Sequence, residues 1–177
     1  MKILEIITNG FEEVEALATL ALLRRAKLDV DLVSLHGDKL KGVHNIDVCS
    51  LKLLNDIDLD SYDMLIIPGG PEYIEEENDP NFLNIIKEFA LKGKYIAAIC
   101  AAPTILGHLG LLKGKKYTCF TSMDEDFGGQ YIDQYVVRDE KLITARSCAA
   151  SIDFALEIID ALLGKETLNK IKNQIYY

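Results

Sequence analysis

The sequence predicts one doubly wound α/β domain, in which a mainly parallel sheet is covered by helices on both faces. Two observations lead to this prediction. Short apolar runs without polar alternation indicate strands that are buried on both faces, and segments with helical periodicity separate these runs. The chain of 177 residues also contains no linker, internal repeat or low-complexity stretch, so we assign residues 1–177 to a single domain.

The first half of the chain alternates strands and helices. Apolar runs predict strands at residues 3–8, 30–35 and 63–67. Residues 12–27 begin with acidic side chains and end with Arg24 and Arg25, which favours a helix because this order complements the helix dipole. The weaker pattern at residues 39–48 predicts a small hairpin.

The second half continues this alternation. Residues 82–90 carry apolar side chains at helical spacing, and Asp79 and Pro80 before them are typical of a helix start. A short helix is expected at residues 102–109, and a final helix at 152–163 that ends at Gly164. Further strands are predicted at residues 95–99, 117–120, 135–138 and 142–145.

The composition excludes several classes of function. The net charge is −9 and the isoelectric point is near 4.8, so the surface repels nucleic acid and anionic membranes, and neither is expected as a partner. The apolar stretch near Met1 is too short for a secretory signal, and no stretch is long enough for a membrane span. These observations predict a cytoplasmic protein.

Cysteine and histidine spacing gives no sign of a disulfide framework or a zinc site. The four cysteines are Cys49, Cys100, Cys119 and Cys148. They form no C-x-x-C pair, which indicates free thiols in a reducing compartment. The three histidines form no H-x-x-x-H pair and lie beside no cysteine, so we predict no metal site.

Cys100 is the strongest candidate for a reactive residue. It stands between a predicted strand and a predicted helix, in the stretch AAICAAP at residues 97–103. The small neighbouring side chains permit the sharp turn of a nucleophile elbow, and a helix N-terminus favours the thiolate and lowers the thiol pKa. A buried cysteine that packs as a small apolar side chain explains the same pattern.

Two further stretches follow predicted strands and point towards the same edge of the sheet. The glycines of PGGP at residues 68–71 let backbone N–H groups approach a developing oxyanion, although a plain tight turn explains them equally well. Glu12, Glu13 and Glu15 follow the first strand, where acids are commonly solvated. One that turned inwards beside a thiol would have a raised pKa and could donate a hydrogen bond to sulfur, and the sequence does not distinguish among the three.

Taken together and in order, four stretches resemble the ThiJ/PfpI superfamily in its DJ-one-like branch. They are NGFEEVE at residues 9–15, PGG at 68–70, AAICAAP at 97–103, and residues 154–156 with 161–166 of the final helix. The resemblance covers nearly the whole chain. It implies a flavodoxin-like three-layer sandwich, a homodimer and an activity that needs no cofactor.

The resemblance also implies roles for individual residues. Cys100 would be the reactive thiol, with Glu15 bonded to its sulfur. Backbone N–H groups of Gly70 and Ala101, beside Gly69, would line an oxyanion and substrate pocket. The implied activities are conversion of glyoxals to hydroxy acids, repair of glycated groups, and oxidative-stress sensing with chaperone-like protection.

Three departures from the family pattern matter for the chemistry. Ala101 stands where the protease and amidase branch has a histidine, and Phe120 stands where some relatives place a histidine near the thiol. Residues 147–150 read SCAA in place of a Gly-Pro-Gly-Thr loop. His108 cannot replace these histidines, because a helix would place it about 12 Å along the axis from Cys100. Cys148 either fills the space left by the missing loop or acts as a redox partner of Cys100.

Three functions remain open from the sequence. The first is a cysteine-dependent glyoxalase or deglycase that acts on small reactive carbonyls, with slow turnover because no histidine is available. The second is a redox sensor or chaperone without catalysis, in which Cys100 is oxidised to a sulfinate that Glu15 stabilises. The third, an intracellular cysteine protease or amidase, is the weakest because it needs a histidine as base.

Overall fold

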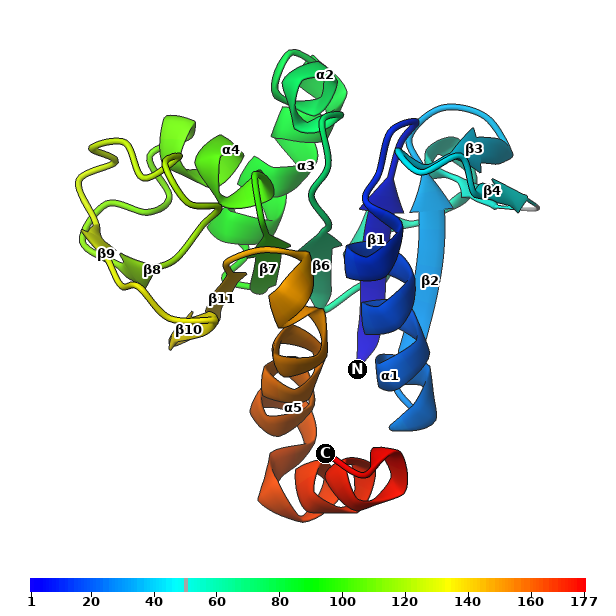
Figure 1. Cartoon of the computed structure of the whole chain (residues 1–177). Helices are drawn as coiled ribbons and strands as arrows, with labels where there is room; N and C mark the ends of the chain where they lie inside the picture. The colour runs from blue at the N-terminus through cyan, green and yellow to red at the C-terminus, as the bar shows by residue number, and fades with distance from the viewer. Residues whose placement is uncertain (50) are drawn as a thin grey trace.

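A seven-stranded sheet forms the middle layer of the computed structural model, which describes residues 1–49 and 51–177. The strand order is β10-β11-β7-β6-β1-β2-β5 (Figure 1). Every neighbouring pair is parallel except β10 and β11. The predicted mainly parallel sheet, with helices on both sides, is therefore confirmed.

The strands lie close to the apolar runs of the sequence. The large sheet contains β1 (Lys2–Ile7), β2 (Asp29–Ser34), β5 (Lys52–Leu53), β6 (Met64–Ile67), β7 (Tyr95–Ile99), β10 (Val136–Asp139) and β11 (Leu142–Ala145). The predicted hairpin is present as β3 (Lys39–Lys41) and β4 (Asp47–Cys49). The strand expected at residues 117–120 is shorter, because only β8 (Lys116–Tyr117) pairs, and it pairs with β9 (Gln130–Tyr131) outside the large sheet.

The helices differ from the sequence prediction at three places. The α-helices are α1 (Thr19–Arg25), α2 (Tyr73–Glu77), α3 (Pro80–Leu91), α4 (Ala102–His108) and α5 (Ser151–Ile175). The helix predicted at 12–27 begins instead as the π-helix η1 (Val14–Ala18), and α2 was not predicted. Short 3-10 turns lie at η2 (Leu54–Asp56), η3 (Leu59–Ser61) and η4 (Cys148–Ala150). Gly164 does not end the last helix, because the chain kinks there at φ 77° and continues as helix.

Two hydrophobic layers hold the helices on the sheet. On β1, Ile3 and Ile7 face the layer formed with α1 and α5, whereas Leu4 and Ile6 face the layer formed with α3 and α4. All four side chains are buried. Figure 1 shows α1 and α5 side by side on one face of the sheet. This burial on both faces explains why the strands read as continuous apolar runs.

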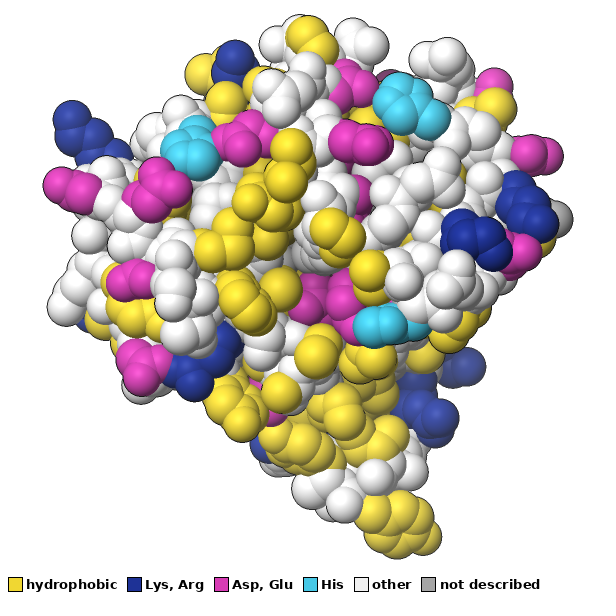
Figure 2. All heavy atoms as spheres, turned by 45° about the horizontal axis from the view of Figure 1, so that its top comes forward, with side chains coloured by type: hydrophobic (Ala, Val, Ile, Leu, Met, Phe, Trp, Pro, Cys, Tyr) yellow, Lys and Arg dark blue, Asp and Glu magenta, His cyan; other side chains and the backbone are white. Residues whose placement is uncertain are grey.

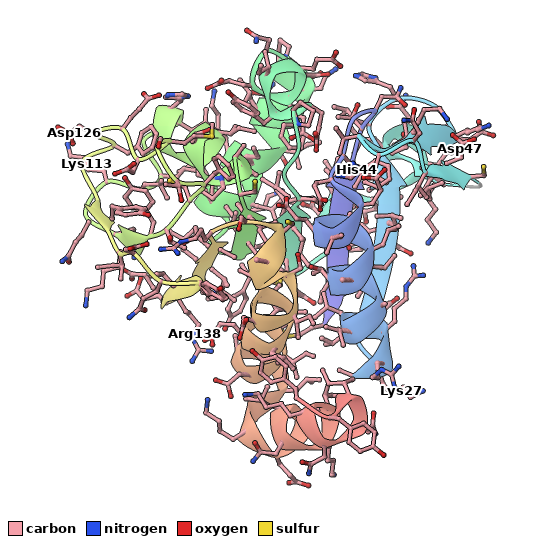
Figure 3. All side chains as sticks on the ribbon, in the orientation of Figure 1. Lys27, His44, Asp47, Lys113, Asp126 and Arg138 are labelled. Atoms are coloured by element: carbon pink, nitrogen blue, oxygen red, sulfur yellow. The ribbon has the colours of Figure 1, made fainter. Side chains whose placement is uncertain are left out.

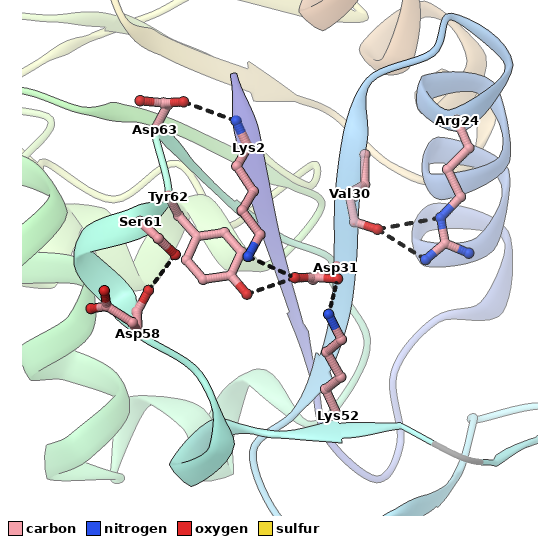
Figure 4. A network of polar contacts seen from close by, with 9 residues as sticks. All are labelled: Lys2, Arg24, Val30, Asp31, Lys52, Asp58, Ser61, Tyr62 and Asp63. Carbon is pink, nitrogen blue, oxygen red and sulfur yellow. Dashed lines mark hydrogen bonds and ion pairs between the residues drawn. The ribbon is translucent and has the colours of Figure 1, made fainter.

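The amino-terminal edge of the sheet is held by a polar network around Asp31 (Figure 4). Its carboxylate accepts hydrogen bonds from Tyr62 at 2.7 Å and Lys52 at 2.5 Å, and Lys2 lies 3.3 Å away. Burial alone would raise the pKa of Asp31, but these hydrogen bonds outweigh burial and lower it. This network ties β1, β2, β5 and the segment before β6 together.

The carboxyl ends of the strands form the opposite edge of the sheet. The strand order reverses around β1, whose neighbours are β2 and β6. Doubly wound sheets bind their ligands beyond the strand ends at such a reversal, so the loops after β1, β6 and β7 are the place to look for a site. Among the described residues, no helix is long and apolar enough to cross a membrane.

Candidate active site

Cys100 occupies a sharp turn between β7 and α4. Its φ angle is 66°, in the left-handed region that non-glycine residues rarely adopt. Two hydrogen bonds hold this conformation: the Cys100 N–H donates to the Ala145 carbonyl at 2.9 Å, and the Cys100 carbonyl accepts the Phe120 N–H at 2.7 Å. The turn has the geometry of the predicted nucleophile elbow, in which strain in the backbone presents the side chain at the strand end.

Glu15 is the acid that turns inwards beside this thiol. It lies in the π-helix η1, a feature that often marks functional sites, and only 1% of its surface is exposed. Its Oε2 accepts the Gly69 N–H at 2.8 Å, and Oε1 is buried without a hydrogen-bond partner within residues 1–49 and 51–177. The carboxyl faces the Cys100 thiol. Burial raises the pKa of Glu15 to about 7. The carboxyl therefore carries or releases a proton near neutral pH.

Gly69 is required by the close approach of these two side chains. A Cβ atom at this position would lie 2.6 Å from Cys100 Cβ, 2.6 Å from Glu15 Oε2 and 2.8 Å from the Ile99 carbonyl. No side chain fits such contacts. The glycine pair after β6 thus brings the thiol and the acid together, which a plain tight turn would not require.

The thiol pKa differs from the sequence prediction. Burial raises the pKa of Cys100, and the negative charge of Glu15 raises it further. The Ala101 N–H at the start of α4 acts in the predicted direction and lowers the pKa, but burial outweighs it. Because Cys100 and Glu15 interact this strongly, their protons leave in two steps that belong to the pair. After the first step, one proton remains to be shared between sulfur and carboxylate.

The elbow and the glycine pair each offer a backbone N–H group as a candidate oxyanion donor. The Ala101 N–H points to the Cys100 sulfur, and the Gly70 N–H has no acceptor in the part of the chain that the structure describes. The N–H of Gly69, in contrast, is already used to hold Glu15. Gly70 and Ala101 therefore stay candidate oxyanion donors, whereas the Gly69 N–H holds the Glu15 carboxyl and positions it. The predicted place of Gly69 in the oxyanion and substrate pocket stays a prediction.

Glu72 is a second buried acid that sequence reasoning missed. It follows Pro71 just before α2, and 4% of its surface is exposed. Burial and the negative charge of Glu76 raise the pKa of Glu72 to about 10, so it is a neutral acid at pH 7. Its Oε2 lies against Gly70: a Cβ there would come within 2.1 Å of that oxygen. The run of acids at residues 72–77 gives no sign of this, because acids in a short surface helix are commonly solvated.

Three further residues that the sequence analysis discussed lie near the site or at the end of α4. Cys148 is exposed in η4, and the charges of Glu12 and Glu15, after burial, raise its pKa. Cys148 therefore belongs to the same edge of the sheet as Cys100. Phe120 contacts the Cys100 backbone as expected for the position that holds a histidine in some relatives. His108 ends α4, where it pairs with Glu77 and Glu125.

Figure 2 shows this face of the molecule, with the carboxyl ends of the strands towards the viewer. Acidic side chains lie at the bottom of a hollow near its centre, and apolar side chains border the hollow.

Comparison with known proteins agrees with this geometry. The model of the DJ-1/PfpI family matches residues 1–161. Protein DJ-1 homolog B of Arabidopsis thaliana is 36% identical over 170 residues, which cover 93% of this chain and 39% of that protein. The chain thus spans less than half of that plant relative.

Two relatives of similar length carry names that describe an activity. Glutathione-independent glyoxalase DJR-1.2 of Caenorhabditis elegans is 30% identical over 163 residues, 90% of this chain and 87% of that protein. Deglycase TK1284 of Thermococcus kodakarensis is 31% identical over 151 residues, 82% of this chain and 90% of that protein.

Comparison with solved structures finds proteins of the same family. The crystal structure of Drosophila melanogaster DJ-1beta superposes with a TM-score of 0.91 at 30% identity, over 99% of this chain and 98% of that one. A flavodoxin-like fold with this strand order, a family match over most of the chain and an elbow cysteine beside a buried glutamate lead to one conclusion: the chain belongs to the DJ-1/PfpI family.

Proposed function

We propose that this protein converts small glyoxals into hydroxy acids without a cofactor, with Cys100 as the nucleophile and Glu15 as the proton carrier. One observation carries this proposal: the Glu15 carboxyl faces the Cys100 thiol with a pKa raised to about 7. Relatives named as a glutathione-independent glyoxalase and as a deglycase support the same class of small-carbonyl chemistry.

The first step forms a bond between sulfur and carbon. The Cys100 thiolate adds to the aldehyde carbon of the glyoxal, and the aldehyde oxygen becomes an alkoxide. The N–H groups of Gly70 and Ala101 donate to this oxygen, which then takes from Glu15 the proton that the sulfur released, so that a hemithioacetal forms and Glu15 is a carboxylate again. The thiolate becomes available because Glu15 can hold the proton that the sulfur releases.

The second step moves hydrogen within the bound substrate. Glu15 takes the proton from the former aldehyde carbon, and the electron pair forms the C=C bond of an enediolate. The same carboxyl returns this proton to the other carbon, while the hydroxyl proton of the hemithioacetal passes to the oxygen of that carbon. The product is a thioester of a 2-hydroxy acid on Cys100. Water hydrolyses this thioester, which releases the hydroxy acid and restores the thiol, so the cycle needs no oxidant and no cofactor.

We also propose a homodimer and a cytoplasmic location, as the family resemblance and the composition imply. A second candidate function is redox sensing. The observation that favours it is the exposed thiol of Cys148 at the same sheet edge as Cys100. In that case Cys100 is oxidised, and Glu15 stabilises the product by donating a hydrogen bond.

Steady-state kinetics with methylglyoxal test the proposal. We expect stoichiometric lactate and a kcat/KM above roughly 10 M⁻¹s⁻¹, which is low against the usual 10⁴–10⁸ M⁻¹s⁻¹ because no histidine assists. Cys100→Ser should lose at least about 100-fold, and peroxide pretreatment should inactivate the wild type. Cys49→Ser is the matched control, since Cys49 is an exposed thiol in β4. A wild-type rate below that limit, or full activity in Cys100→Ser, would leave redox sensing as the better hypothesis.

A further inference from the structure

A second polar cluster lies beside the proposed active site and takes no part in the mechanism above. It consists of Glu12 and Glu13, which follow β1, and His44 in the β3–β4 hairpin. Figure 3 shows His44 next to the carboxyl end of β1. One ligand-type atom from each of the three residues lies within 4.8 Å of the others, and His44 Nε2 is 3.6 Å from Glu12 Oε1.

Glu13 has the character of an unused ligand. Only 4% of its surface is exposed, yet its Oε2 is buried without a hydrogen-bond partner among the described residues. Its Oε1 accepts the N–H of His44 at 2.8 Å and the N–H of Ile46 at 3.3 Å. Burial would raise the pKa of Glu13, but these backbone hydrogen bonds and the neighbouring imidazole outweigh burial and lower it. One oxygen of this carboxyl is thus anchored by backbone donors, and the other is buried and free to bind a ligand.

The negative charge of this cluster is not balanced by the protein. Within residues 1–49 and 51–177, neither Glu12 nor Glu13 pairs with a lysine or an arginine, and the imidazole of His44 is the one group of potential positive charge beside them. Two adjacent carboxylates that are largely screened from water attract a cation strongly. A nearly buried carboxyl oxygen without a hydrogen-bond partner, such as Glu13 Oε2, is costly unless something binds it.

The donor set selects a class of ion. One imidazole nitrogen and two carboxylate oxygens suit a divalent transition metal such as zinc, cobalt, manganese or ferrous iron. Calcium and magnesium prefer oxygen ligands alone, and copper(I) prefers sulfur. In a tetrahedral zinc site, ligand atoms stand roughly 3.4 Å apart, which is close to the 3.6 Å between His44 Nε2 and Glu12 Oε1.

We propose that Glu12, Glu13 and His44 form a binding site for one divalent transition-metal ion. The three side chains supply three ligands, and water completes the coordination, since His44 is exposed. This inference does not rest on the proposed glyoxalase function. It also revises the expectation of no metal site, which considered only the spacing of cysteine and histidine along the chain.

The site is joined to the proposed active site by the backbone. Glu12 Oε2 accepts the Glu15 N–H at 2.8 Å, and the Glu12 N–H donates to the Gly69 carbonyl at 2.8 Å. After burial, the negative charge of Glu12 also raises the pKa of Glu15. A cation held by Glu12 would therefore lie next to the backbone segment that carries Glu15.

Titration of the untagged, metal-free protein with Co²⁺ tests this proposal. At about pH 7.5, where metal-ligating imidazoles are deprotonated, we expect one equivalent to bind and to produce visible d–d absorption without a sulfur-to-cobalt charge-transfer band. His44→Gln and Glu13→Gln should each weaken binding at least about tenfold. The glutamine at 13 keeps an oxygen for the His44 and Ile46 N–H groups, and His44 is exposed, so both variants should fold.

Three controls make the outcome decisive. His36→Gln removes another exposed histidine that pairs with an acid, Asp79, and should bind Co²⁺ as the wild type does. Cys100→Ser and Cys148→Ser should also leave binding unchanged. Binding that is lost in a thiol variant, that survives both His44→Gln and Glu13→Gln, or that is absent in the wild type overturns the proposal. None of these readouts depends on glyoxalase activity, so the two proposals fail separately.

Discussion

Three buried carboxyl groups at opposite edges of the central sheet have pKa values that are shifted in opposite directions. At the amino-terminal edge, Asp31 is paired with Lys2, Lys52 and Tyr62, and its pKa is lowered. At the carboxyl edge, Glu15 and Glu72 are buried without a cationic partner in the described chain, and their pKa values are raised to about 7 and about 10. Both edges belong to the same sheet, and they differ mainly in whether positive charge reaches the acid.

This difference separates stability from chemistry. A paired carboxylate such as Asp31 is ionised at every physiological pH and cannot exchange a proton usefully. An unpaired buried acid costs stability when it ionises, but it can carry a proton near neutral pH. The carboxyl edge therefore has the groups that the proposed reaction needs, whereas the paired carboxylate at the amino-terminal edge stabilises the fold.

The largest effect is expected from Glu15→Gln. Glutamine keeps an acceptor for the Gly69 N–H but cannot carry a proton, so kcat/KM for methylglyoxal should fall at least about 100-fold. In the wild type, the pair with two protons lacks a base, and activity should rise as one proton leaves through an apparent pKa of about 7. Glu77→Gln, at a partly exposed acid paired with His108, should change neither rate nor profile. Equal losses in both variants would contradict the role of Glu15.

A change at the amino edge should affect stability without affecting the chemistry. Asp31→Asn removes the charge from three hydrogen bonds and should lower the free energy of unfolding by about 2 kcal/mol. Because the folded pKa of Asp31 is lowered, its stabilisation is present above the unfolded pKa, near 3.9, and is lost as pH falls through the folded value. Urea unfolding at neutral and acidic pH measures this, and an equal difference at both would contradict the ionic origin.

Glu72→Gln should change stability in the opposite direction. Because the folded pKa is raised to about 10, the folded state holds a proton that the unfolded state releases, and stability falls with rising pH between about 4.5 and 10. Glutamine has no proton to lose, so the variant should be more stable than the wild type by at least about 1 kcal/mol at pH 9 and nearly equal at pH 4. Thermal unfolding at the two pH values tests this, with Glu75→Gln as the control on an exposed position of the same helix.

Most of the sheet was predictable because strands buried on both faces leave unmistakable apolar runs. The misses have local causes. Strand β5 has two residues, and the acidic helix α2 has one turn, so neither shows a period. Gly164 reads as a helix end, whereas its positive φ allows a kink that α5 continues beyond. The π-helix η1 leaves no mark in the apolar pattern of residues 12–27.

The candidate site was predictable in part. The elbow at Cys100 follows from small residues between a strand and a helix, and the choice of Glu15 over its neighbours came from the family resemblance. The burial of Glu13 and Glu72 was not predictable, because each depends on a partner segment distant in sequence: the hairpin at His44 for Glu13 and the loop at Gly10 for Glu72. The lowered thiol pKa expected for Cys100 was wrong because local sequence does not report the depth of burial.

The smallest expected effect concerns Cys148, which lies at the carboxyl edge although it is exposed. Mild peroxide followed by intact-mass measurement separates two outcomes. If Cys148 resolves a sulfenic acid on Cys100, the protein loses two hydrogens, and Cys148→Ser abolishes this change. If Cys148 only fills space, Cys100 gains two oxygens while Cys148 still reacts with iodoacetamide.

A disulfide needs Cα atoms roughly 4.4–6.8 Å apart. Cys148 lies in the turn η4 and Cys100 in the elbow, so the backbone restricts how far either residue can move towards the other. The raised pKa values of both thiols slow the exchange, so we expect the two-oxygen product to dominate, with Cys49 reacting with iodoacetamide in every sample as the control for an exposed thiol.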